Sequence, residues 1–218
     1  MKIRVEEVRK TFRTPDGSQH EVLRIGRLEI PDGAQWVITG KSGSGKTTFL
    51  NVLGGIITPD AGRVVIGDTD VTSLSEARRD RFRARHLGYV FQTFNLLDGF
   101  DALENVLVAM LFGGGVDRDR ASRLLDRVGL ADRSRYRPSE LSVGQQQRVA
   151  IARALANDPQ VILADEPTGN VDPSTGESII ALLKEVCAEK NRSLIIVTHQ
   201  PQVVASFPDV MDLSKLQN

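Results

Sequence analysis

The chain has 218 residues, and its 28 Lys and Arg residues balance its 28 Asp and Glu residues, giving a formal net charge of +0. A nucleic-acid-binding protein would favour a basic excess, so the composition argues against a nucleic-acid partner. The only cysteine, Cys187, excludes an internal disulfide and fits a reducing compartment. We expect it to be a packed, unreactive thiol.

The sequence has no stretch with the features of a membrane span. Its longest apolar run, Val106–Phe112, is far shorter than the roughly 20 residues that such a span needs. Met1–Lys10 alternates charged and apolar residues, which is not typical of a signal peptide. We therefore expect a soluble chain, and any work at a membrane would depend on another chain.

The first third of the chain carries mostly strand patterns. A strand with one solvated face is predicted around Ile3–Val8, and a second over Val22–Ile30. Trp36–Thr39 is apolar enough for a buried strand, and a helix is predicted next, over Lys46–Leu53. A hairpin is then predicted for residues 64–71, because Gly67-Asp68 fits a two-residue turn between residues 64–66 and 69–71.

The rest of the chain alternates helical patterns with apolar strands. The predicted helices are Ser75–Arg85, Leu103–Phe112, Arg118–Val128, Gly144–Ala156 and Ser174–Glu189, and the predicted buried strands are Val161–Ala164 and Leu194–Thr198. This alternation predicts an α/β fold with a mostly parallel sheet. We expect one domain over residues 1–218, with antiparallel strands near the N-terminus and a helical insert over residues 93–157.

The clearest chemical motif matches the pattern G-x-x-x-x-G-K-[ST] between a predicted strand and a predicted helix. This phosphate loop consists of Gly40, Lys41, Ser42, Gly43, Ser44, Gly45, Lys46 and Thr47. Its glycines let backbone N–H groups turn toward phosphates, and the helix N-terminus adds partial positive charge. We expect Lys46 to reach the β- and γ-phosphates, Thr47 to hold Mg²⁺ and Thr48 to offer a hydroxyl near the α-phosphate.

Two carboxylates, Asp165 and Glu166, follow the buried strand Val161–Ala164. Strand alternation would place their side chains on opposite sides, so we expect them to have different roles. Asp165 is predicted to support Mg²⁺, and Glu166 to polarise the attacking water. His199 follows the last buried strand, at the sheet edge where such folds bind ligands, and is predicted to contact the γ-phosphate.

A second candidate anion site lies at Leu141-Ser142-Val143-Gly144-Gln145. Ser142 and Gln145 have the spacing of a capping box, which explains why a helix begins there. A helix N-terminus with a hydroxyl and a glycine is also a ready phosphate site. One nucleotide does not need two such segments from one chain, so we expect two chains to face each other across it.

The order of the phosphate loop, Gln92, Leu141–Gln145, Asp165-Glu166 and His199 resembles the ATP-binding-cassette ATPase family over nearly the whole chain. The resemblance implies a P-loop NTPase with a RecA-like core, an antiparallel β subdomain and an inserted helical subdomain. It also implies an ATP-dependent, head-to-tail homodimer that hydrolyses ATP with Mg²⁺. Each ATP would contact the phosphate loop of one subunit and Ser142, Gly144 and Gln145 of the other, so we call Leu141–Gln145 the signature segment.

The resemblance extends to further positions. Phe12 stands where the family places an aromatic that stacks on adenine, although a place in the strand core is the alternative for this side chain. Gln92 corresponds to the family's loop glutamine near Mg²⁺ and the attacking water. Asp172 corresponds to the acid of a loop that contacts the partner subunit. Val143 departs from the family, which usually has glycine there.

Within the family, Leu87–Leu97, Ala102–Val106 and Ala164–Asn170 are most similar to the lipoprotein-release, macrolide-export and cell-division branch. This implies a transport-coupled ATPase subunit on the cytoplasmic face of the inner membrane. There it would be held by a separate membrane subunit that docks near Gln92–Phe100. An ATP-gated regulatory switch is the alternative. The basic run Arg78–His86 is predicted to be a solvated helix face, with contacts to a partner or to anionic lipid as the other possibility.

Two further functions that use a phosphate loop fit the sequence less well. DNA-repair and chromosome-organising ATPases of the same family carry long coiled-coil insertions, which this sequence lacks. Small-molecule kinases lack a segment like Leu141–Gln145.

Overall fold

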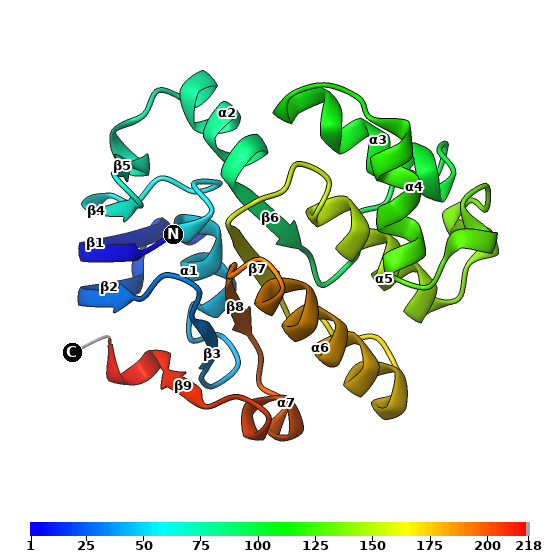
Figure 1. Cartoon of the computed structure of the whole chain (residues 1–218). Helices are drawn as coiled ribbons and strands as arrows, with labels where there is room; N and C mark the ends of the chain where they lie inside the picture. Colours follow the sequence, from blue (N-terminus) through cyan, green and yellow to red (C-terminus); the bar gives the residue numbers. More distant parts are fainter. Residues whose placement is uncertain (217–218) are drawn as a thin grey trace.

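The computed structural model describes residues 1–216 and contains two sheets (Figure 1). A four-stranded antiparallel sheet has the order β2-β1-β4-β5, and a five-stranded parallel sheet has the order β6-β7-β8-β3-β9. The strands are β1 Ile3–Arg13, β2 Gln19–Ile30, β3 Gln35–Thr39, β4 Ala61–Ile66, β5 Thr69–Asp70, β6 Leu87–Val90, β7 Val161–Asp165, β8 Ser193–Val197 and β9 Asp209–Asp212. The predicted fold class is thus confirmed.

The α-helices are α1 Lys46–Leu53, α2 Glu76–His86, α3 Ala102–Gly113, α4 Arg118–Arg127, α5 Val143–Ala154, α6 Pro173–Ala188 and α7 Pro201–Ala205. The predicted helices agree with α1 to α6 within two residues at each end, which is the usual uncertainty of helix ends. Within residues 1–216 no helix is long and apolar enough to cross a membrane.

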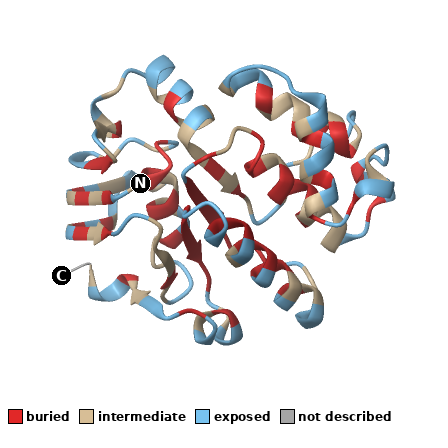
Figure 2. Cartoon of the chain, viewed as in Figure 1, coloured by how far each residue is buried: buried red, intermediate tan, exposed pale blue. Residues whose placement is uncertain are grey.

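The parallel sheet divides the interior into two cores. Ile162 and Ala164 of β7 pack in one core with residues of α3, α4, α5 and α6. The alternate residues Val161 and Leu163 pack in the other core with α1 and the antiparallel sheet. Side chains of a strand point to opposite faces in turn, so burial of both faces explains why β7 is apolar throughout. The red strands at the centre of Figure 2 show this burial.

Helices α3, α4 and α5 lie together at one end of the molecule, far from the antiparallel sheet (Figure 1). They fall between β6 and β7 in the sequence, within the insert predicted for residues 93–157. They share the core of the parallel sheet rather than forming a core of their own. The exact bounds of a helical subdomain therefore stay a prediction.

Among the strands and α-helices, three were not predicted from sequence patterns, namely β6, α7 and β9. β6 begins directly after α2, and β9 pairs with β3 at the edge of the parallel sheet. Cys187 is buried, and burial raises the pKa of its thiol to about 12, as expected for a packed, unreactive cysteine.

Several arginines of α2 bond to other parts of the same chain. Arg79 donates to Thr58, Arg83 donates to the Gly55 carbonyl and Arg85 donates to the Gly113 carbonyl.

Candidate functional site

The phosphate loop connects β3 to α1, as predicted. Gly45 is the N-cap residue of α1, has φ 87°, and makes no side-chain cap bond. A Cβ atom at Gly45 would lie 2.7 Å from the Val22 carbonyl oxygen, so only glycine fits there. The first-turn N–H groups of α1 therefore have no capping side chain, which suits them to bind an anion.

Lys46 places its ammonium group inside the phosphate loop. The residue is only 8% exposed, and its Nζ donates to the carbonyl oxygens of Gly40 at 3.0 Å and Lys41 at 2.9 Å. No carboxylate among residues 1–216 forms an ion pair with it. The loop therefore holds a buried cation whose hydrogen-bond partners are neutral carbonyls, which leaves its charge available to an anionic ligand.

Thr47 and Asp165 meet at the carboxyl end of the parallel sheet. The Thr47 hydroxyl donates to Asp165 Oδ1 at 3.1 Å. Burial is the main cause that raises the pKa of Asp165, while the Thr47 hydrogen bond acts in the opposite direction. A hydroxyl and a carboxylate are the hard oxygen ligands that Mg²⁺ prefers. Within residues 1–216 no group of three or more His, Cys, Asp or Glu could hold a metal, and Mg²⁺ needs no such group when phosphates and water complete its shell.

Glu166 follows Asp165 directly but has different hydrogen-bond partners. Its Oε2 accepts from the Thr198 hydroxyl at 2.8 Å, and its Oε1 accepts from the His199 backbone N–H at 3.1 Å. The His199 ring Nδ1 lies 2.6 Å from the same Oε1. The different roles expected for Asp165 and Glu166 stay a prediction, but the strand alternation given as their reason was wrong. The strand ends at Asp165, and Glu166 has φ 44° rather than a strand conformation.

In the folded chain, Gln92 lies beside the turn that follows Glu166. β6 pairs with β7, so the ends of these two strands are neighbours. Asn170 Nδ2 donates to the Gln92 carbonyl at 2.9 Å, and the Gln92 side-chain nitrogen lies 3.5 Å from the place a Cβ on Gly169 would take. The structure thus brings together the phosphate loop, Asp165, Glu166, Gln92 and His199 at one sheet edge.

The signature segment begins α5 with a complete capping box. The Gln145 backbone N–H donates to the Ser142 hydroxyl at 3.3 Å, and the Ser142 N–H donates to Gln145 Oε1 at 3.0 Å. Gly144 packs against α6, where a Cβ atom would lie 2.6 Å from Thr175 Cγ2. The segment borders a cavity of about 460 Å³ together with Asp172, and the described lining includes no residue of the phosphate loop.

Asp172 and Phe12 both lie where a ligand or partner can reach them. Asp172 is the N-cap of α6, and its hydrogen bonds from Ser174 and Thr175 lower the pKa of the carboxyl well below its ordinary value. Phe12 is 40% exposed, and Lys10 Nζ lies 5.5 Å from the centre of its ring. This exposure contradicts a place in the strand core for Phe12.

Sequence reasoning missed the role of Thr198, which gives Glu166 its only hydroxyl partner among residues 1–216. Its position directly before His199 at a predicted strand end was the one available signal.

Comparison with known proteins agrees with this geometry. The family model described as "ABC transporter" matches residues 23–169. The chain therefore belongs to the ABC transporter family, as an ATP-hydrolysing cassette. This confirms the predicted family and enzyme class.

Particular relatives refine the picture. The lipoprotein-releasing system ATP-binding protein LolD of Syntrophus aciditrophicus is 47% identical over 90% of this chain and 89% of that protein. The macrolide export ATP-binding/permease protein MacB of Syntrophobacter fumaroxidans is 43% identical over 92% of this chain and 29% of its own length. The dimeric, post-hydrolysis structure of the cassette MJ0796 bound to ADP and Pi has a TM-score of 0.89 at 37% identity, covering 96% of this chain and 93% of that one.

These relatives are named for release or export, so the comparisons support the prediction of a transport ATPase and not the alternative of an ATP-gated switch.

Proposed function

We propose that the chain is the ATPase subunit of a transporter that extrudes lipoproteins or other lipid-like cargo. It acts as an ATP-dependent homodimer bound to a separate integral-membrane subunit on the cytoplasmic face of the inner membrane. The observation that carries this proposal is that one chain has two helix starts that would bind anions, the uncapped start of α1 after the phosphate loop and the signature segment before α5. The signature segment borders a cavity of its own, so it suits the nucleotide of a second subunit.

ATP would bind along the phosphate loop. Gly40, Ser42, Gly43, Ser44 and Gly45 offer backbone donors to the phosphates, Lys46 balances their charge, and Thr48 stands in the first turn of α1. Thr47, Asp165 and Gln92 would hold Mg²⁺, which when bound neutralises charge on the phosphate oxygens. The close Thr47 and Asp165 oxygens support this assignment.

Glu166 would orient and deprotonate the attacking water. Its carboxylate is buried and accepts from three donors of Thr198 and His199, which fix its direction. His199 is largely exposed on its other side and would contact the γ-phosphate, as the sequence predicts. A positioned carboxylate would thus abstract the proton of the water, and a fixed donor would stabilise the charge that develops on the phosphate.

Ser142, Gly144 and Gln145 would complete the pocket around the ATP of the other subunit. A bulky cation at Ser142 should block that contact without touching the subunit's own phosphate loop. We expect Ser142→Arg to leave ATP binding by the monomer intact but to lower ATP turnover by about 100-fold or more, since it removes a donor that acts on the reacting phosphate.

Ser139→Arg is the matched control for this variant, because Ser139 is exposed and stands just before the signature segment. Equilibrium ATP binding and phosphate release should be measured on both variants. Normal ATPase activity in Ser142→Arg would remove the signature segment from the pocket.

Phe12 would stack on adenine, since ring stacking does not need a hydroxyl. We expect Phe12→Ala to weaken ATP binding roughly tenfold and to reduce the preference for ATP over GTP. Competition binding with both nucleotides measures this preference. Phe100→Ala is the control, since Phe100 has a similar exposure of 41%. An unchanged ATP/GTP ratio would argue against stacking by Phe12.

The membrane subunit would dock beside the loop Gln92–Phe100. A cavity of about 460 Å³ lies next to the start of this loop between α2, α3, α5 and β6, and its lining includes Ile56, Phe91 and Phe112. Phe112 is 70% exposed and Ile56 is 44% exposed. Exposed apolar side chains around a groove are typical of a protein interaction site.

A further inference from the structure

The loop between β6 and α3 connects the catalytic edge of the sheet to the docking groove. Its first residues belong to the catalytic edge, because the Gln92 carbonyl accepts from Asn170 in the turn after Glu166. Its later residues are bonded instead to two helices of the insert. These bonds determine whether each part of the loop moves with the parallel sheet or with the helices of the insert.

Arg153 of α5 binds the middle of this loop. Its guanidinium donates to the Phe94 carbonyl at 2.5 Å and to the Asn95 carbonyl. Phe94 and Asn95 have φ 55° and 50°, a backbone conformation that is unusual for residues other than glycine and that needs such support. Within residues 1–216, Arg153 forms no ion pair with a carboxylate, and burial lowers the pKa of its guanidinium. These two carbonyls are therefore the main partners of a largely desolvated cation.

Asn105 of α3 binds the end of the loop. The residue is 1% exposed. Its Oδ1 accepts from the Leu97 N–H at 2.8 Å, and its Nδ2 donates to the Leu97, Phe100 and Asp101 carbonyls at 3.2, 3.2 and 3.0 Å. The buried amide thus directs both its oxygen and its N–H groups to the loop and its end, which ties Leu97, Phe100 and Asp101 to α3.

These contacts leave one residue between two anchored parts. Gln92 is bonded to the turn after Glu166, and Phe94 is bonded to α5. Only Thr93 lies between them. Thr93 is itself bonded toward Asn95, because its carbonyl accepts from the Asn95 N–H and its hydroxyl donates to Asn95 Oδ1 at 2.9 Å. If α5 shifts relative to the parallel sheet, the change in backbone angles must therefore fall close to Gln92, where the Phe94 N–H also donates to the Phe91 carbonyl at 3.3 Å.

We propose that Arg153 is a positioning residue that makes residues 94–101 move together with α5. The proposal rests on the proposed function, in which the partner's ATP attracts the signature segment at the start of α5. Arg153 lies ten residues after Val143, about 15 Å along the same helix, so a rigid α5 would carry that movement to the docking loop. Nucleotide binding at one subunit would thereby change the surface offered to the membrane subunit.

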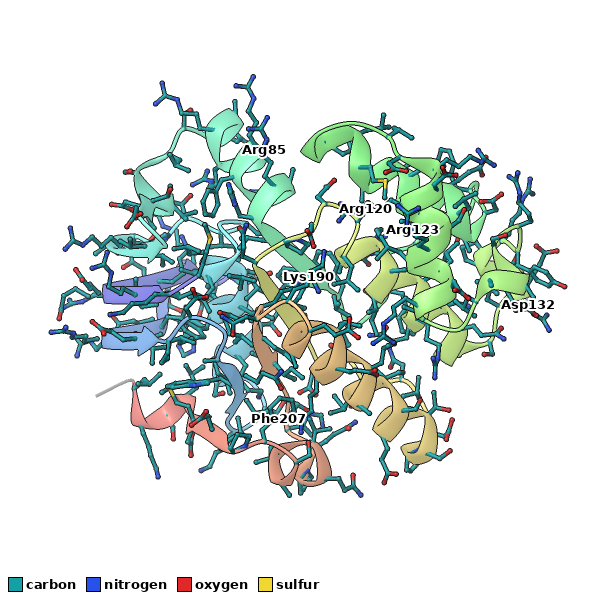
Figure 3. All side chains as sticks on the ribbon, viewed as in Figure 1. Arg85, Arg120, Arg123, Asp132, Lys190 and Phe207 are labelled. Atoms are coloured by element: carbon teal, nitrogen blue, oxygen red, sulfur yellow. The ribbon has the colours of Figure 1, made fainter. Side chains whose placement is uncertain are left out.

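Amide hydrogen exchange tests the proposal in the Glu166→Gln protein, with and without Mg²⁺ and ATP. We expect ATP to form dimers and to slow exchange at residues 142–146 whether or not Arg153→Met is also present. When Arg153 is present, ATP should change the exchange rate of residues 94–101 at least severalfold. When Arg153→Met is present, ATP should leave the exchange rate of these residues unchanged. If Arg153 only stabilised the loop, Arg153→Met would change the exchange rate of residues 94–101 without ATP. The exchange rate of these residues would still respond to ATP. Arg123→Met is the control, since Arg123 is an exposed arginine of α4 (Figure 3).

Equal ATP responses at residues 94–101 with and without Arg153 would overturn the proposal. If Arg153→Met does not fold, Arg153→Lys replaces it, because lysine keeps the charge but lacks the planar pair of donors. The ATP response of residues 94–101 should then be smaller than with arginine, and an unchanged response contradicts the proposal. Failure of the Glu166→Gln protein itself to dimerise with ATP would instead reject the proposed function, and the coupling with it.

Discussion

Glu166→Gln is expected to reduce steady-state ATP hydrolysis by about 10²- to 10⁴-fold, the usual contribution of a positioned general base. ATP binding should remain, because the Glu166 carboxylate bonds to Thr198 and His199 and is not a donor to the phosphates. The uncleaved ATP should hold two subunits together. Phosphate release measures the first effect, and sizing chromatography with and without ATP measures the second.

Glu177→Gln is the matched control for this variant, because Glu177 is an exposed glutamate of α6. It should hydrolyse ATP at the normal rate and should not accumulate as a dimer. If Glu166→Gln stays monomeric at saturating ATP, the ATP sandwich is wrong. If it hydrolyses ATP normally, Glu166 is not the base.

Lys46→Ala is expected to lose most of its ATP affinity. Hydrogen bonds to charged groups contribute about 1.5–3 kcal/mol each, so losing the two that one ammonium group can give to phosphates should weaken binding by about 100-fold or more. The substitution also removes the donor that the carbonyls of Gly40 and Lys41 now share, which loosens the loop. Isothermal titration with ATP measures the change in Kd.

Lys41→Ala provides the comparison for Lys46→Ala. Lys41 is in the same loop and carries the same charge, but it is exposed. We expect its ATP affinity to change only a little, since a solvated charge contributes little to binding. Unchanged ATP binding by Lys46→Ala would rule out the phosphate loop as the nucleotide site.

Sequence patterns predicted the strands and helices in which the pattern of apolar residues matches the burial of those residues in the fold. Val161–Ala164 and Leu194–Thr198 are apolar throughout because both faces of the sheet are covered, and both are strands. β6 lacks such a signal because it contains Gly88. A Cβ atom at Gly88 would lie 2.4 Å from the Ala154 carbonyl oxygen, so this glycine serves close packing against α5.

The candidate site divides in the same way. The phosphate loop could be located because its chemistry needs a fixed local order of residues. The partners of Glu166 could not, since Thr198 and His199 lie more than thirty residues away and meet it only through the pairing of β7 with β8. Arg153 was unremarkable in a helical pattern, and only the folded chain brings it to Phe94 and Asn95.

A crystal structure of Glu166→Gln with ATP and Mg²⁺ tests the central claim most directly. The account predicts two protomers related by a twofold axis, with Lys46 of one protomer and Ser142 of its partner bound to the same triphosphate. A closed, ATP-bound state in which one protomer alone provides every protein contact to the nucleotide would contradict it.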